Sequence, residues 1–302
     1  MPSDPKELLL LAAKSNNLTT DDLKPWHVKA TFAAFDDQGK PTDQGTYEEF
    51  WAAPNKFKRT YSTSSFTRSE FGSNQGLLRA GSGDLNLNLV LAAQELTKPL
   101  PDENLEAGSY SVKETQVGAA TFNCVHHDPG GPNYCLGTQQ AILRVSVIGP
   151  DQIVRNRVLA FQNHFVPGDL KIIRSGQTLL TFHVDSIESL PTVDDADFAP
   201  SADAVHVPVN ISGAVAQGMI LYAQAPKYPP VAKANHVTGT VVLQGIIGKD
   251  GHVKNLKVVS GHADLQMAAI DAVRFWRYKP YLLNGEPVEV MTTINVVFAL
   301  NL

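Results

Sequence analysis

The last quarter of the chain, residues 228–302, constrains the fold most, because it combines hairpin signals with one helical stripe. Val237 to Gly248 is rich in β-branched residues and contains no proline, which predicts a strand. Lys249-Asp250-Gly251 follows it, and Asp-Gly between two such runs indicates a tight turn, because glycine tolerates positive φ. We therefore expect an antiparallel return strand from Val253 to Ser260.

A helix is expected next, from Ala263 to Trp276, because the apolar residues change to helical spacing. After Pro280 and a second turn signal at Asn284-Gly285, we expect a long last strand from Val288 to Leu300. Alternation predicts that one set of its residues packs on the helix, namely Val288, Val290, Thr292, Ile294, Val296, Phe298 and Leu300. With a short helix at residues 231–235, the segment predicts an α+β unit of two helices on a three-stranded antiparallel sheet.

This segment resembles the C-terminal domain of the TonB family of energy transducers. The resemblance rests on ordered short motifs over about the last 75 residues, and its marker positions are Tyr228, Pro229, Gly239, Asp250, Gly251, Trp276 and Pro280. It implies a periplasmic protein-binding domain that contacts outer-membrane receptors by strand addition at a sheet edge. The expected edge residues are Val288, Val290, Met291, Thr293, Asn295 and Val297.

Two features of family transducers are missing from this sequence, an apolar N-terminal anchor of about 20 residues and a long proline-rich spacer. A role in TonB-type transport is what the resemblance implies, whereas the two missing features argue against energy transduction by this chain itself. We expect a targeting or anchor segment to have preceded Met1, or the chain to be a secreted protein that uses the same domain. Self-association through the C-terminal domain is a further expectation.

The first two hundred residues predict a helix at Asp4 to Ser15, a second helix at Asp84 to Leu96 with Asp84 as its N-cap, and about ten short strands. Leu87 and Leu91 lie off the apolar stripe of the second helix, which predicts that this helix is covered on most sides. Regular turn signals between the strands favour one large curved antiparallel sheet or an open β-barrel with helices on its concave side. The expected strands are Trp26–Asp36, Gly45–Ala53, Lys56–Thr63, Phe66–Phe71, Gln75–Arg79, Tyr110–Gln116, Ala120–His126, Ala141–Ile148, Ile153–His164, Leu170–Ser175 and Thr178–Ser186.

This half resembles the LolA-like group of periplasmic lipoprotein carriers. The residues behind the resemblance are Gly45 to Tyr61, with the turn Pro54-Asn55, and Gly168 to Ile172, together with the N-terminal helix and the strand meander. The resemblance implies an incomplete barrel with an apolar cavity able to hold an acyl chain.

The two cysteines, Cys124 and Cys135, flank His126-His127-Asp128 and a turn sequence, Asp128-Pro129-Gly130-Gly131-Pro132. Reversal of the chain there favours a disulfide, which suits an oxidising compartment such as the periplasm. The alternative is a pair of buried free thiols. The histidine spacing does not match a structural zinc pattern, so exposed loop histidines are favoured over a metal site.

Pro, Ala and Asp are frequent from Leu190 to Gly213, which predicts a boundary. The expected domains are residues 1–190, a linker at 191–214, and a TonB-like domain at 215–302. A short strand within Val205 to Ile211 is also expected.

Composition and motifs argue against several function classes. The net charge is −5 with scattered Lys and Arg, so no nucleic-acid footprint is present. Ser62-Thr63-Ser64-Ser65 lacks a nucleophile-elbow context, and Gly81-Ser82-Gly83 lacks the lysine and spacing of a phosphate loop. Trp276 is expected in the core and not in a binding patch. We expect no enzyme, no metal and no cofactor.

Two hypotheses follow for the function. In the first, a periplasmic binding protein uses its TonB-like domain to recognise an envelope protein by strand addition. In the second, the N-terminal β domain carries a lipid or another apolar ligand. A continuous apolar lining inside the sheet would favour the second hypothesis, and an interior filled by the protein's own aromatic side chains would count against it.

Overall fold

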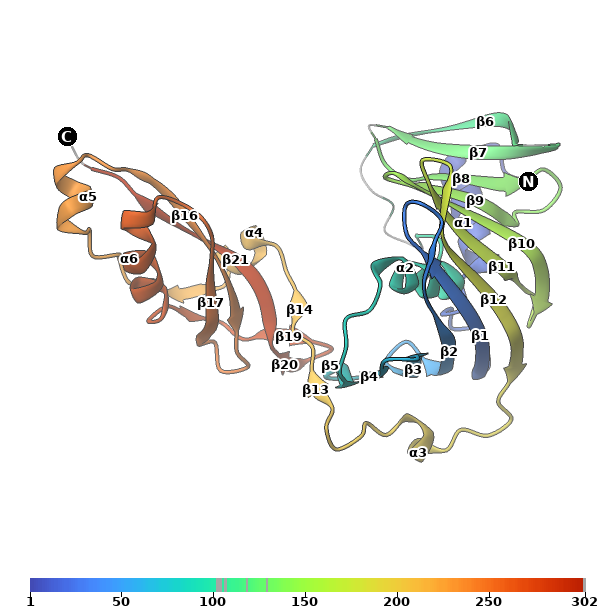
Figure 1. Ribbon diagram of the computed structural model, residues 1–302, viewed down its shortest axis with the longest axis horizontal. Helices are drawn as coiled ribbons and strands as arrows, with labels where there is room; N and C mark the ends of the chain where they lie inside the picture. Colours follow the sequence, from blue (N-terminus) through green and yellow to red (C-terminus); the bar gives the residue numbers. More distant parts are fainter. Residues whose placement is uncertain (102–104, 106–107, 118, 129, 301–302) are drawn as a thin grey trace. The chain divides into compact units, whose positions relative to one another are not determined.

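The computed structural model describes residues 1–101, 105, 108–117, 119–128 and 130–300. Contacts between Cα atoms divide the chain into two compact units. The first unit comprises residues 1–71 and 80–203, and the second comprises residues 72–79 and 204–302. The chain is mostly β-structure, with few helices (Figure 1).

One antiparallel sheet dominates the first unit, in the order β4-β3-β2-β1-β12-β11-β10-β9-β8-β7-β6. Its strands pair mostly with their sequence neighbours, except that β1 pairs with β12 along most of its length. The predicted curved antiparallel sheet is confirmed (Figure 1). Its strand order is linear, so the sheet does not close into a barrel. Its strands are β1 (Trp26–Phe35), β2 (Pro41–Ala53), β3 (Lys56–Thr63), β4 (Thr67–Ser73), β6 (Ser109–Val117), β7 (Ala120–Asp128), β8 (Asn133–Gly137), β9 (Leu143–Ile148), β10 (Asp151–Phe161), β11 (His164–Arg174) and β12 (Gln177–Ser189).

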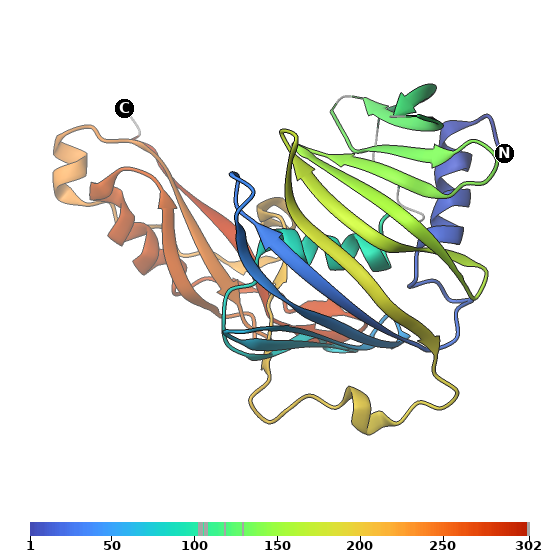
Figure 2. The ribbon, with the colours of Figure 1, turned by 45° about the vertical axis from the view of Figure 1, so that its right-hand side comes forward.

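Two helices pack on this sheet, α1 (Pro5–Asn16) and α2 (Leu87–Thr97), and a short helix, α3 (Asp195–Phe198), lies against β3. Both views show α2 inside the curve of the sheet (Figures 1 and 2). The apolar stripe of α2 is buried against β1, β11 and β12 because its leucines and alanines recur at helical spacing. The core around α2 is rich in aromatic side chains from the sheet, namely Trp26, Phe32, Tyr47, Trp51, Tyr61 and Phe182.

The second helix differs from the prediction at its start. Asn86, not Asp84, is the N-cap, and its side chain accepts a hydrogen bond from the Asn88 backbone N–H at 2.8 Å. Leu87 is 83% exposed, but Leu91 packs against the core, and the exposed residues 87, 90 and 94 share one side of α2, so the helix is covered on its other sides, as expected.

Two strand predictions in the first unit were wrong. The strand expected from Ile153 to His164 ends earlier, at Phe161, because Gln162 and Asn163 adopt positive φ and reverse the chain, and the strand expected from Leu170 begins already at His164. Strand β8 lies where a loop was expected, and it pairs with β7.

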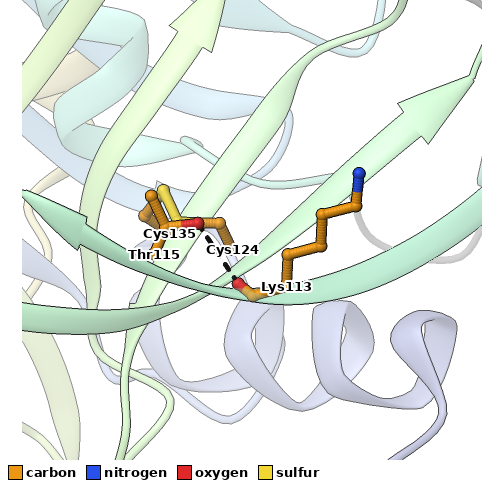
Figure 3. The surroundings of a disulfide bond; sticks show 4 residues. All are labelled: Lys113, Thr115, Cys124 and Cys135. Carbon is orange, nitrogen blue, oxygen red and sulfur yellow. Dashed lines mark hydrogen bonds between the residues drawn. A yellow bond between two sulfur atoms is a disulfide. The ribbon is translucent and has the colours of Figure 1, made fainter.

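A disulfide joins Cys124 and Cys135, as predicted, across the neighbouring strands β7 and β8 (Figure 3). The two residues are direct partners in the ladder. The predicted chain reversal between them is confirmed, although Pro129 lies outside the described residues. The histidine prediction was wrong, because His126 and His127 lie in β7 and not in an exposed loop, and the buried His127 ring stacks on Tyr110.

The second unit contains a four-stranded sheet in the order β14-β21-β16-β17. The antiparallel part matches the predicted three-stranded sheet, and β14 adds a short parallel strand. Two small sheets flank it, and Trp276 is buried in its core, as expected. Its elements are β5 (Gly76–Gly81), β13 (Val205–His206), β14 (Val209–Asn210), α4 (Gly213–Gln217), β15 (Ile220–Tyr222), α5 (Pro230–Ala234), β16 (Gly239–Ile247), β17 (Val253–Ser260), α6 (Ala263–Val273), β18 (Arg277–Tyr278), β19 (Tyr281–Leu283), β20 (Glu286–Val288) and β21 (Val290–Phe298).

The segment expected to be a linker, residues 191–214, divides between the two units after residue 203. Residues 204–214 supply β13, β14 and the start of α4 to the second unit. Independent folding of the expected domains, residues 1–190 and 215–302, stays a prediction.

Candidate binding sites

The last strand, β21, has one side paired along its whole length and the other side paired only at its start. β16 pairs with it from Gly239↔Phe298 to Ile247↔Val290. On the other side, β14 pairs in parallel with Val290 and Met291 only. Beyond Met291, no further strand pairs with that side of β21 within the described residues, and helix α4 packs beside the strand near Thr293.

The backbone hydrogen bonds identify which residues face this edge. Val209 donates its N–H to the carbonyl of Glu289 at 2.9 Å, and Ile211 donates to the carbonyl of Met291 at 3.0 Å. Backbone groups alternate in direction along a strand, so the odd-numbered residues of β21 point away from β16. Thr293, Asn295 and Val297 therefore direct their N–H and C=O groups toward the edge.

The side chains of the same strand alternate as predicted. The even-numbered residues from Val290 to Phe298 are buried, whereas Thr293, Asn295 and Val297 are exposed, and Val297 is 65% exposed. Helix α4 begins beside this edge. Its first residue, Gly213, lies so close that an added β-carbon would be 2.9 Å from the Thr293 carbonyl oxygen.

The expected edge is therefore shorter than the six residues predicted from the sequence. Val288 lies in β20, where it pairs with Tyr281. Val290 is buried, and Met291 already accepts a hydrogen bond from the β14 segment. The pairing of β14 with the start of β21 could not be predicted from periodicity, because β14 is only two residues long.

The opposite edge of the sheet, β17, has features that disfavour pairing with another strand. Its register against β16 shifts twice, between Val242 and Leu243 and between Gln244 and Ile246. It also carries Lys254 and Lys257. Irregular register and lysines are common protections of exposed strand edges.

The marker positions of the TonB resemblance have structural roles. The Tyr228 hydroxyl donates to the Val237 carbonyl at 2.5 Å, and Trp276 Nε1 donates to the Gln224 carbonyl at 2.9 Å. Gly251 has φ of +77°, and its carbonyl accepts from the Tyr278 N–H at 3.0 Å. The remaining markers cap or bend the chain: Pro229 precedes α5, Gly239 starts β16 with positive φ, Asp250 caps the turn through the His252 N–H, and Pro280 follows β18.

A second candidate site is a cavity of about 790 Å³ in the first unit. Strands β2 and β3 and helix α2 contribute to its wall, together with residues 19–21. Its lining is mixed and includes Glu49, Trp51, Phe57, Arg59 and Val90. The continuous apolar lining that an acyl-chain carrier needs is therefore absent from this wall, and the aromatic core described above fills the neighbouring interior.

Charged groups gather behind this wall. Arg59 donates from Nε to Glu70 Oε2 at 2.9 Å, and Arg68 donates to Glu70 Oε1 at 3.0 Å. Burial by itself raises the pKa of Glu70, but Arg59 and Arg68 outweigh it and hold that pKa below its ordinary value.

Glu49 is the other carboxyl in this cluster, and it is 3% exposed. Burial raises its pKa, although Arg59 and the hydroxyl of Tyr47, which donates to Glu49, act in the opposite direction. Sequence reasoning missed this site. The available signal was a charged residue at an inward position in each of two alternating strands, Glu49 and Arg59.

Within the described residues, no group of His, Cys, Asp and Glu is arranged to hold a metal ion. No helix in the same part of the chain is long and apolar enough to cross a membrane.

Residues 224–300 match the model of the family described as Gram-negative bacterial TonB protein C-terminal. Protein TonB of Xanthomonas campestris pv. campestris is 38% identical over 78 residues, which cover 25% of this chain and 35% of the relative. Protein TonB of Vibrio cholerae serotype O1 is 30% identical over 77 residues, covering 25% of this chain and 32% of the relative. The chain thus spans about a third of the length of the curated relatives it matches.

Among solved structures, a putative outer membrane lipoprotein-sorting protein domain from Vibrio parahaemolyticus aligns with a TM-score of 0.43 at 6% identity, covering 65% of this chain and 97% of the other. A LolA superfamily protein from Nitrosomonas europaea aligns with a TM-score of 0.42 at 6% identity, covering 64% and 97%. These likenesses bear on neither the ligand nor the partner of this chain.

Proposed function

We propose that the second unit recognises an envelope protein by strand addition to the edge formed by Thr293, Asn295 and Val297. The observation that carries this proposal is the direction of their backbone groups, which point away from β16 beyond the end of β14. An added strand would satisfy those groups and cover the exposed side chains. The TonB similarity of residues 224–300 supports an envelope partner.

The proposed location is the periplasm. The disulfide between Cys124 and Cys135 supports an oxidising compartment, as does the similarity to TonB. No specific observation favours a carrier of a purely apolar ligand, because the cavity of the first unit carries charged groups.

A photo-crosslinking amino acid at Val297 tests the proposal in intact cells. We expect an adduct with an envelope protein from Val297, and none from the same residue placed at Val259, which is exposed on β17. A second copy of the chain as the adduct would identify the edge as a dimer interface instead.

Substitution of Asn295 then separates backbone from side-chain effects. Asn295→Pro removes an N–H that faces the edge and is not used in pairing with β16, whereas Asn295→Ala keeps it. We expect the adduct to be lost in the proline variant and retained in the alanine variant, with both variants folded by circular dichroism. Equal adduct yields in the two variants would refute strand addition.

A further inference from the structure

A short segment of the second unit, residues 208–218, covers part of the edge of β21. It contains β14, which pairs with Val290 and Met291, and helix α4, which packs beside β21. Gly213, the first residue of α4, lies so close to Thr293 that an added β-carbon would be 2.9 Å from the Thr293 carbonyl oxygen. A strand that pairs with β21 through Thr293 would therefore collide with the start of α4. This covering segment is called the strap below.

The strap is anchored just outside its two ends. Val207 donates its backbone N–H to the Leu77 carbonyl at 2.8 Å, and Lys279 donates to the Met219 carbonyl at 2.8 Å. Between these points, the backbone hydrogen bonds that join the strap to other described residues belong to the two-residue pairing of β14. The strap can therefore leave β21 while both of its ends stay attached, and it can close again.

The side chains of the strap bury little surface. Of residues 208–218, all of which the structure describes, only Ala216 is buried, and Val209 and Ile211 are partly buried against the core. Val215 is 48% exposed. Helix α4 has five residues, which is too short for a helix to be stable by itself in water. Its position thus depends on these few contacts.

The pairing on the other side of β21 is much longer. Nine residue pairs join β16 and β21, from Gly239↔Phe298 to Ile247↔Val290. Segments with few buried contacts open at a lower free energy than the core of a sheet. The strap is therefore expected to open while the ladder between β16 and β21 stays closed.

We propose that the strap is an autoinhibitory cover, and that an added strand gains access to Thr293 by displacing it from β21. With the strap closed, the uncovered edge contains only Asn295 and Val297. A strand that pairs with two residues makes few hydrogen bonds, so the closed form binds weakly. This inference rests on the proposed strand addition, because the strap regulates that same edge.

Amide hydrogen exchange on the whole chain tests the opening without any partner. The Ile211 N–H takes part in the pairing of the strap, whereas the Ile294 N–H faces β16 in the long ladder. We expect the Ile211 amide to exchange at least about 100-fold faster than the Ile294 amide. Equal protection of the two amides would mean that the strap opens only together with the sheet, and it would overturn the proposal.

A matched pair of charges in α4 tests what holds the strap. Ala216→Asp places a carboxylate at the buried contact, whereas Ala214→Asp places it at an exposed position of the same helix. In the first variant, we expect the exchange rate at Ile211 to rise at least about tenfold and the adduct from a photo-crosslinking amino acid at Val297 to increase. The second variant should behave as the parent, and the Ile294 amide should stay protected in both. An unchanged Ile211 exchange rate in Ala216→Asp would overturn the proposal.

A cross-link tests the opposite change and decides the question if Ala216→Asp does not fold. Asn210 and Met291 are direct partners in the parallel pairing, and neighbouring strands lie about 4.8 Å apart, which a disulfide can span. Asn210→Cys combined with Met291→Cys, once oxidised, should lock the strap and reduce the Val297 adduct at least about tenfold. Asn210→Ser combined with Met291→Ser cannot cross-link, so its adduct yield should match that of the parent.

The adduct yields separate failure of the strap from failure of strand addition. Equal yields from the locked protein and the serine control would overturn the strap as a cover and leave strand addition intact. Loss of the adduct from the parent, the serine control and Ala216→Asp alike would refute strand addition itself, and regulation by the strap with it.

Discussion

Val209 donates its backbone N–H to the carbonyl oxygen of Glu289 at 2.9 Å, and this bond begins the parallel pairing of β14 with the last strand. The segment before α4 thus occupies the start of an edge that the sequence predicts to be free. The proposed binding edge begins where this pairing ends.

Release of β14 should lengthen the edge. Ile211→Pro removes the N–H that donates to the Met291 carbonyl, so we expect faster hydrogen exchange at Val209 and Met291 and a loss of about 1 kcal/mol of stability. The Val297 adduct should form at least as well as in the parent protein. Ile211→Val is the control, because it keeps the N–H. An unchanged exchange rate at Met291 in the proline variant would show that this bond does not hold β14.

Two turn glycines of the second unit should differ in their tolerance of a side chain. Gly251 and Gly285 both have positive φ, at +77° and +85°. A β-carbon at Gly251 would lie 2.0 Å from the Tyr278 carbonyl oxygen, whereas one at Gly285 meets nothing within 4 Å. We expect Gly285→Ala to cost about 1 kcal/mol and Gly251→Ala clearly more, measured by urea unfolding. Equal costs would mean that the backbone contact at Gly251 relaxes freely.

Loss of the disulfide should destabilise the first unit alone. Replacing Cys124 and Cys135 together by Ser removes a cross-link between residues 11 apart in sequence, which we expect to cost about 3 kcal/mol. The change should appear in hydrogen exchange of β7 and β8 and be absent from β16 and β21. Dithiothreitol added to the parent protein should reproduce it, and a loss of protection in both units would contradict the prediction.

Glu49 and Glu70 should give opposite pH dependences of stability. Tyr47, Arg59 and Glu70 surround Glu49, whose pKa is raised, so its contribution is full at acidic pH and lost as the pH rises through the folded-state pKa. Glu49→Gln should therefore be more stable than the parent at pH 8, with a difference that vanishes below about pH 4.

Glu70 serves as the counterpart, because its pKa is lowered by Arg59 and Arg68 against the effect of burial. Its contribution is present at neutral pH and lost as the pH falls through the folded-state pKa. Glu70→Gln should be less stable than the parent at pH 8 and approach it in acid. Urea midpoints from pH 3 to pH 8 measure both variants, and the same sign for both at pH 8 would refute this account.

Alternation in the sequence predicted much of the fold, because it reports which face of a strand is buried. In β3, Phe57, Arg59 and Tyr61 alternate with Lys58 and Thr60, which indicates that the first three share one face, and Tyr61 is buried on that face. It could not show that Glu49 lies opposite Arg59, since register depends on the turn between the strands. The reversal at Gln162 and Asn163 was missed because no glycine or proline marks it.

The pairing of β14 also could not be predicted from the sequence, for a different reason. A strand of two residues is too short to show the alternation of buried and exposed residues that marks longer strands. The partial burial of Val209 also depends on β21, which lies about eighty residues later in the chain. The family resemblance predicted an apolar cavity, whereas the wall of the observed cavity includes the charged residues Glu49 and Arg59.

The parallel strand β14 also decides how the second unit responds to mechanical load. Tension that travels along the backbone to Val209 reaches the four-stranded sheet first through β14, whose short pairing with β21 includes hydrogen bonds to the carbonyl groups of Glu289 and Met291. The long ladder between β16 and β21 lies behind them and is held by many more residue pairs. A pull from the N-terminal side would therefore break the short pairing between β14 and β21 first. The pairing between β16 and β21 would stay intact, and β14 could pair again afterwards.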